Sequence, residues 1–351
     1  MKKGSILIFV TWILLLLTLL AVSVGLRSRL GIGLATFQNQ YLSEIYSTHS
    51  AVNLAAFFIN QDEDPQNDWV QDVWYDQTSG FSQFGVSKEF SIHIIDEESK
   101  LNLNALTPQN AVILEKFFSI LKENHIKLET DPKELASGIM NWMGKPTADS
   151  KPTIGFEQKK APFESIDELL LIQKITAQDF EILKPFFTVY SQNRAGQLKI
   201  NINTAHPWVL RAIVESLTGG DFEKQDLFNR IERYRKGDPK DPKAAPPLPF
   251  MQSDLRVEAL IQKLGLSNSV DMVNMMNQFV TLFVTTDSQF FSVHVETKKK
   301  GYVYPRAVDA VLGFRQPVLV QVSKGVLNLQ QRLNNALNGY PYEILYWNEQ
   351  A

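Results

Sequence analysis

An uncharged apolar run near the N-terminus constrains this chain more than any other feature. The run extends from Ser5 to Leu26, is rich in Leu, Ile and Val, and lies between Lys2-Lys3 and the pair Arg27 and Arg29. As an α-helix with a rise of about 1.5 Å per residue it spans about 33 Å, enough to cross the hydrocarbon core of a bilayer. Lys2 and Lys3 favour a cytoplasmic N-terminus, although Arg27 and Arg29 reduce the contrast. The sequence therefore predicts a single membrane-spanning helix.

A cleaved secretory signal is the alternative interpretation of this run. Ala21-Val22-Ser23 loosely fits the small-x-small pattern of a signal peptidase site. The apolar run is, however, longer than the ~7–15 residues of a typical secretory signal. Its length favours a permanent anchor.

The apolar pattern continues beyond the membrane run at helical spacing. No proline interrupts the chain before Pro65, whereas Gly31 and Gly33 each cost a helix about 1 kcal/mol relative to Ala. We therefore expect one helix over residues 5–59, with its second half packed on the body of the protein. Residues three or four apart form the apolar stripe: Leu30, Leu34, Phe37, Tyr41, Ile45, Thr48, Val52, Ala55 and Ile59.

The remaining pattern of strands, then helices, then strands again predicts an α+β fold. We expect an antiparallel β-sheet from residues 60–104 and 277–325, an inserted helical domain over 105–276, and a C-terminal tail over 326–351. Strands are predicted at 90–95, 100–104, 278–285, 289–297, 302–313 and 317–322. Helices are predicted at 111–122, 132–143, 166–173, 177–186, 207–217, 224–234, 253–263 and 270–276.

The helical domain contains a duplicated pattern. Lys100–Ala105 recurs as Lys199–Thr204, and Pro162-Phe163 recurs as Pro249-Phe250. This self-similarity predicts two copies of a helix-hairpin-helix-like unit. Because short polar side chains favour helix starts and turns, we expect a capping or other structural role for five residues: Asn102, Asn104, Asn201, Asn203 and Thr204.

Helix-hairpin-helix units bind DNA backbones in other proteins, so DNA binding is a second hypothesis. The block carries equal numbers of acidic and basic residues, whereas DNA binding of this kind relies on a basic face. The hairpin positions also lack a Gly-x-Gly, with only Gly219-Gly220 approaching it. These features favour a scaffold and predict no nucleic-acid partner.

The sequence offers no catalytic constellation. It has no cysteine, and the five histidines are scattered singly without a His-x-x-x-His spacing. Acidic clusters supply the only metal candidates, because calcium is bound by several oxygen ligands. No EF-hand spacing is present, and solvated loops are the competing explanation. The candidate ligands for calcium are Asp62, Asp64, Asp68 and Asp96.

The residues taken together resemble a known family. Lys2-Lys3-Gly4 directly before the apolar helix is similar to a type IV prepilin leader, and Phe9 stands where major subunits carry a glutamate. The ordered segments 96–104, 161–170 and 200–205 are similar to general secretion pathway protein K, a minor pseudopilin of type II secretion systems. The resemblance covers residues 1 to about 325. Differences are Asn141–Gly144 in place of Asp-Trp-x-Asp, the absence of a cysteine pair, and the tail.

The resemblance implies a pilin-like long helix and a structural, non-enzymatic role without a required cofactor. It implies a leader over 1–4, cleavage after Gly4 by prepilin peptidase, and a methylated N-terminus at Ser5. The protein would be a single-pass inner-membrane protein with a cytoplasmic N-terminus and a periplasmic body. It would join other minor pseudopilins at the tip of the pseudopilus and support export of folded proteins across the outer membrane. The alternative is a membrane-anchored periplasmic binding module, with DNA as a candidate ligand.

Overall fold

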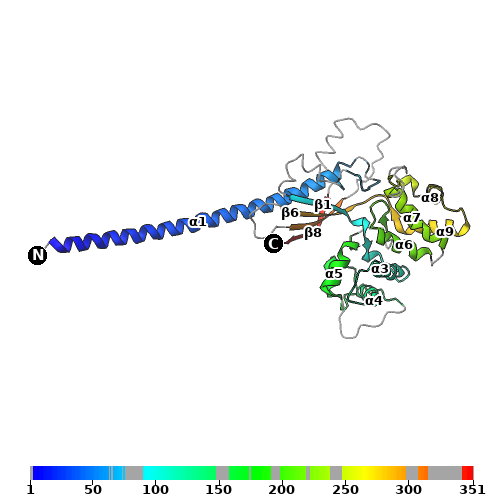
Figure 1. Cartoon of the computed structure of the whole chain (residues 1–351), viewed down its shortest axis with the longest axis horizontal. Helices are drawn as coiled ribbons and strands as arrows, with labels where there is room; N and C mark the ends of the chain where they lie inside the picture. The colour runs from blue at the N-terminus through cyan, green and yellow to red at the C-terminus, as the bar shows by residue number, and fades with distance from the viewer. Residues whose placement is uncertain are drawn as a thin grey trace, which may run out of the picture.

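One long helix dominates the architecture. The computed structural model describes residues 3–62, 64, 66–72, 74–75, 90–147, 158–173, 175–190, 198–218, 222–237, 247–297, 307–314 and 342–350. Helix α1 (Lys3–Asn60) is continuous over 58 residues, and its N-terminal part projects from the rest of the molecule (Figure 1). Within it, an 18-residue window has a mean hydropathy of 2.8 and none of it is buried against other described residues. The helix is long and apolar enough to cross a membrane.

The threonine hydroxyls in the apolar part of α1 have partners within the helix. Thr11 Oγ1 donates to the carbonyl of Ile8 at 2.8 Å, and Thr18 Oγ1 donates to the carbonyl of Leu15 at 2.8 Å. Such bonds matter because a bilayer core offers no water to a polar group.

A four-stranded antiparallel sheet lies beside the C-terminal part of α1. Its strand order is β1-β6-β7-β8, and Figure 1 shows the strands running alongside the helix. The strands are β1 (Phe90–Asp96), β6 (Phe290–Thr297), β7 (Ala307–Phe314) and β8 (Tyr342–Gln350). A register irregularity falls between Val311 and Leu312, where β7 meets β8.

One face of this sheet packs on the last turns of α1. Small helix residues such as Ala51 and Ala55, four apart, are almost completely buried, so the helix approaches the strands closely. Alternate residues of β6 point into this core, as expected for a half-buried strand. The cluster comprises Ala51, Val52, Ala55, Ala56, Phe58, Ile59, Trp74, Ile94, Phe291, Val293, Val295, Val308, Ala310 and Leu312.

The structure corrects three sequence predictions about strands. Residues 342–350, expected in a tail outside the sheet, form β8 and pair with β7. The strand predicted over 278–285 was wrong for residues 278–283, which are helical. The strand predicted over 100–104 does not enter the sheet, because only Leu101–Asn102 is extended and it pairs elsewhere. The strand predicted over 317–322 lies outside the described residues.

The block between β1 and β6 is mostly helical and has its own core. That core contains Leu101, Phe117, Leu210, Phe250 and Met276 and shares no buried residue with the core of the sheet. The α-helices are α3 (Val112–Glu123), α4 (Pro132–Trp142), α5 (Ala177–Leu183), α6 (Pro207–Thr218), α7 (Phe222–Lys236), α8 (Val257–Leu264) and α9 (Val270–Gln278). Each overlaps a predicted helix, whereas the helix predicted at 166–173 is the 3₁₀ helix η4 (Ile166–Leu171).

Short elements complete the block. Two-residue strands form two parallel ladders: β2 (Leu101–Asn102) with β3 (Phe187–Thr188), and β4 (Ile200–Asn201) with β5 (Val284–Thr285). The remaining turns are η2 (Glu97–Ser99), η3 (Leu103–Ala105), η5 (Lys184–Phe186), η6 (Gln252–Asp254) and the π-helix η7 (Phe279–Phe283). The fold is thus α+β, with a long N-terminal helix, an antiparallel sheet and a helical block between its first two strands.

Candidate functional site

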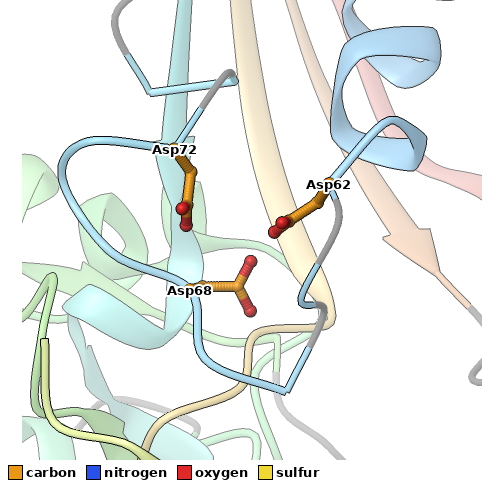
Figure 2. Close-up of side chains that lie close together, drawn as sticks. All are labelled: Asp62, Asp68 and Asp72. Carbon is orange, nitrogen blue, oxygen red and sulfur yellow. The ribbon is translucent and has the colours of Figure 1, made fainter.

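Three carboxylates gather in the loop that follows α1. The ligand oxygens of Asp62, Asp68 and Asp72 all lie within 4.8 Å of one another, and Figure 2 shows the three side chains turned toward a common centre. Trp74, which is fully buried, anchors the end of this loop by an edge contact with Phe291 of β6, at 4.9 Å between ring centroids. The contact of Trp74 with Phe291 therefore places the acidic loop against the sheet.

Backbone hydrogen bonds hold the loop against the segment after β5. The backbone N–H of Asp68 donates to the carbonyl of Thr286 at 2.8 Å. The N–H of Ser288 donates to Oδ2 of Asp68 at 2.7 Å, and Thr286 Oγ1 donates to the carbonyl of Gln66 at 2.8 Å. Asp72 closes a local turn by accepting the N–H of Trp69 at 2.6 Å. The carboxylates are therefore fixed by backbone contacts.

Burial and mutual repulsion perturb all three carboxyl groups. Burial raises the pKa of Asp68 well above its usual value, and the nearby Asp96 and Asp62 raise it further. Burial, with repulsion from Asp62 and Asp64, raises the pKa of Asp72 to about 7. The pKa of Asp62 is also raised by burial, and within the described part of the chain its Oδ2 atom is buried without a hydrogen-bond donor. Full ionisation of the three carboxyl groups is therefore unfavourable in the folded protein.

A divalent cation fits this arrangement chemically. Carboxylate oxygens are the hard ligands that calcium prefers, and calcium sites tolerate irregular geometry. A cation at the centre of the three groups would offset the repulsion that raises their pKa values. Among the described residues, Oδ2 of Asp62 is a buried acceptor without a hydrogen-bond donor. The donor set of Asp62, Asp68 and Asp72 is therefore suited to a calcium-like ion.

The structure separates the four candidate ligands that the sequence suggested. Asp62 and Asp68 belong to the cluster, whereas Asp64 is exposed and accepts a hydrogen bond from Asn67 Nδ2 at 2.7 Å. Asp96 is buried at the end of β1 outside the cluster, where Ser288 and Asn201 each donate both to Asp96 and to Asp68. Asp72 was missed, because only the fold of the loop brings it back to Asp62.

Asp96 joins the sheet to the helical block. Its Oδ2 atom accepts hydrogen bonds from Asn201 Nδ2 at 3.1 Å, from Ser288 Oγ at 2.7 Å and from the hydroxyl of Thr204. Its Oδ1 atom accepts the N–H of Glu98 at 2.8 Å, which caps η2. Burial raises its pKa, and the hydrogen bonds from Thr204 and Ser288 act in the opposite direction. Asn201 and Thr204 therefore connect two parts of the fold.

The duplicated asparagines clamp the duplicated Pro-Phe segments. Asn104 Oδ1 accepts the N–H of Phe163 at 2.7 Å, and its Nδ2 donates to the carbonyl of Phe163 at 2.9 Å. Asn203 makes the same pair with Phe250, at 2.7 Å and 2.9 Å. Each asparagine thus satisfies both backbone groups of a residue far along the chain, which differs from the expected helix capping.

The preceding asparagine of each copy shapes the local turn. Asn102 caps η3 by accepting the N–H of Asn104 at 2.8 Å, and it donates to the carbonyl of Tyr190 at 2.7 Å. Asn201 accepts the N–H of Asn203 at 3.0 Å in the same way. The sequence repeat therefore corresponds to a hydrogen-bonded turn that occurs in both copies.

The predicted processing residues lie at the start of α1. Gly4 and Ser5 belong to its first turns. Phe9 lies in the projecting apolar part, where 67% of its surface is exposed. All three therefore belong to the N-terminal part of α1, which projects from the rest of the molecule (Figure 1).

These features define a class: an α+β chain with a pilin-like long helix, an antiparallel sheet and a helical block. No family model and no curated protein sequence matches the chain. Among solved structures, a similar fold occurs in the crystal structure of the GspK-GspI-GspJ complex from the enterotoxigenic Escherichia coli type 2 secretion system. The similarity has a TM-score of 0.55 at 14% sequence identity, over 90% of this chain and 98% of that chain. The fold is thus similar to that of a component of that complex, in agreement with the resemblance in the sequence.

Proposed function

We propose that the protein is a structural minor pseudopilin of a type II secretion system. The observation that carries the proposal is the similarity of nearly the whole fold to a component of the GspK-GspI-GspJ complex. A second support is the exposed apolar part of α1, which would anchor the subunit in the inner membrane and pack among the helices of related subunits. In this arrangement the N-terminus is cytoplasmic, the sheet and helical block are periplasmic, and neither enzymatic activity nor nucleic-acid binding is required.

The tip of the pseudopilus is the position that suits this shape. The helical block stands beside the sheet at the end of the molecule away from the N-terminus (Figure 1). Filament subunits contact copies above and below themselves through repeated surfaces, and a block of this bulk would obstruct such stacking. Phe9 agrees with a terminal position, because a buried glutamate there would lack a neighbouring amine to pair with.

Processing provides the first test. The proposal requires cleavage after Gly4 by prepilin peptidase, so the mature chain should start at a methylated Ser5. N-terminal mass spectrometry of the membrane-extracted protein measures this directly. A chain that starts at Met1, or near Val24 after signal peptidase cleavage, would contradict the proposal. Deletion of the gene should also stop export of folded proteins, and complementation should restore it.

Salt dependence separates the scaffold from the alternative binding module. A module that binds DNA through phosphates loses affinity steeply as salt increases. We expect the detergent-solubilised protein to show no DNA binding with such a slope. Binding that falls by orders of magnitude between about 50 and 200 mM salt would favour the DNA-binding alternative.

We also propose that calcium binds at Asp62, Asp68 and Asp72 and holds the loop against the helical block. Saturation at about 100 times the dissociation constant adds about 2.7 kcal/mol to the free energy of unfolding. Calcium should therefore raise the melting temperature of the wild type, and Asp68→Asn should abolish the increase. Asp271→Asn is the matched control, since Asp271 is exposed on α9. An equal calcium response in wild type and Asp68→Asn would exclude this site.

A further inference from the structure

The face of the sheet opposite α1 carries a row of ionisable side chains on adjacent strands. His93 of β1 is directly paired with His294 of β6, and His294 is directly paired with Asp309 of β7. The two imidazole rings are 6.4 Å apart between centroids and inclined by 27°. His93 is exposed and His294 is half-buried. Strand pairing therefore holds two imidazoles face to face at the surface.

Hydrogen bonds determine which ring nitrogens remain available. Nδ1 of His294 lies 2.6 Å from Oδ1 of Asp309. Because a carboxylate only accepts, Nδ1 carries the proton and the lone pair of the neutral ring is on Nε2. Nε2 of His93 lies 3.1 Å from Oγ of Ser91, and when it donates there the lone pair is on Nδ1. Each ring thus has one nitrogen held by the protein and one nitrogen available.

We propose that His93 and His294 form a surface site for a zinc-like transition-metal ion, with Glu296 as a carboxylate ligand. Glu296 is exposed, lies two residues beyond His294 on the same face, and is paired with Ser91, which lies two residues before His93 on β1. With Zn–N bonds of about 2.0–2.1 Å, two imidazoles that share an ion have centroids about 5–6 Å apart. The observed separation of 6.4 Å is close to this range, and the rings would turn edge-on to a shared ion so that one lone pair of each ring reaches it.

Asp309 acts as a positioning residue for this site. Carboxylates that accept the second N–H of a metal-binding histidine fix its tautomer and increase its basicity. The hydrogen bond to Asp309 raises the pKa of His294, Glu296 also raises it, and Lys184 of η5 lowers it. The metal requires neutral rings, so protons compete with it.

Calorimetric titration of the detergent-solubilised full chain with zinc tests the site. Excess calcium in the buffer is included to compete with zinc for the separate carboxylates at Asp62, Asp68 and Asp72. We expect one zinc ion per chain under these conditions. His93→Ala and His294→Ala should each raise the dissociation constant at least tenfold. Asp309→Asn should raise it about 10–100-fold, the usual effect of losing such a partner.

Matched controls make the outcome decisive. His49→Ala removes another exposed histidine, which stacks on Trp347 at 4.3 Å, and it should leave zinc affinity unchanged. The visible absorption of bound Co²⁺ gives a second readout, which should be lost in His294→Ala and kept in His49→Ala. Melting curves verify that each variant is folded. Zinc affinity within threefold of wild type in both His93→Ala and His294→Ala would overturn the proposal, whatever the role of the protein in secretion.

Discussion

Replacing Asn203 with alanine should destabilise the helical block more than any ordinary surface substitution. Asn203 is 3% exposed and Phe250 is fully buried. The alanine variant leaves both the N–H and the carbonyl of Phe250 without their present partners. Each buried unsatisfied group costs about 1–3 kcal/mol. For the two groups together we therefore expect a loss of about 2–6 kcal/mol in the free energy of unfolding.

Thermal unfolding measures this loss. For a cooperative unit of about 150–250 residues, 1 kcal/mol shifts the melting temperature by roughly 2–4 °C, so Asn203→Ala should lower it by about 4–24 °C. Tryptophan fluorescence is a suitable probe, because Trp208 of α6 lies in the same unit and is half-buried. Asn104→Ala should cost less, since Asn104 is only half-buried and water can replace part of its hydrogen bonding.

A control of the same chemistry decides the interpretation. Asn274 is exposed within α9, so Asn274→Ala should change the free energy of unfolding by less than about 0.5 kcal/mol. If Asn203→Ala melts within 2 °C of Asn274→Ala, the clamp on Phe250 contributes nothing and the reasoning fails.

Two further predictions concern charge. Without divalent cations, the raised pKa values of Asp68 and of Asp72 (about 7) mean that the folded state retains protons that the unfolded state has released above about pH 4. Their contribution to stability is therefore present at low pH and is lost as the pH rises to about 7. Asp72→Asn should make the melting temperature less sensitive to pH between about pH 4 and 7. Equal slopes of melting temperature against pH in the variant and the wild type would contradict this prediction. In the membrane part, Phe9→Glu should impair secretion and cross-linking to other minor subunits, whereas Phe9→Leu should change neither. If the glutamate variant assembles at the wild-type level, Phe9 no longer supports a position at the tip.

Helices were predictable from the sequence because their determinants are local. The apolar spacing within 112–123 and 207–218, and Pro132 and Pro207 in first turns, identify α3, α4 and α6 without tertiary information. The Asn-x-Asn repeat was also visible. Its contacts were not, because Phe163 and Phe250 reach their asparagines only after the intervening helices fold back. The sequence alone could not identify Phe163 and Phe250 as the partners of Asn104 and Asn203, because each pair is far apart along the chain.

The strands and the acidic site depended on nonlocal pairing. β8 mixes apolar and polar residues, and its place follows from pairing with β7 across residues 315–341. Leu101–Asn102 has a strand-like sequence, but its neighbour is Phe187–Thr188. Asp72 gave no signal of its own, whereas Asp96 looked like a ligand because it is followed by two acids. Only the fold shows that Asp96 is used in a junction.

The buried network at Asp96 also bears on whether the helical block is independent of the sheet. The two hydrophobic cores share no buried residue, which favours independence, yet Thr204 and Asn201 from the block both donate to Asp96 at the end of β1. A double-mutant cycle between Asp96→Asn and Thr204→Val in the full chain measures this connection. Because the two side chains are in direct contact in a buried network, we expect a coupling energy of about 1–2 kcal/mol. Ser119→Ala, on the exposed face of α3, should be additive with Asp96→Asn. Additivity of Thr204→Val as well would mean that the Thr204 hydrogen bond does not couple the block to the sheet, and that Asn201 is the remaining link from the block to Asp96.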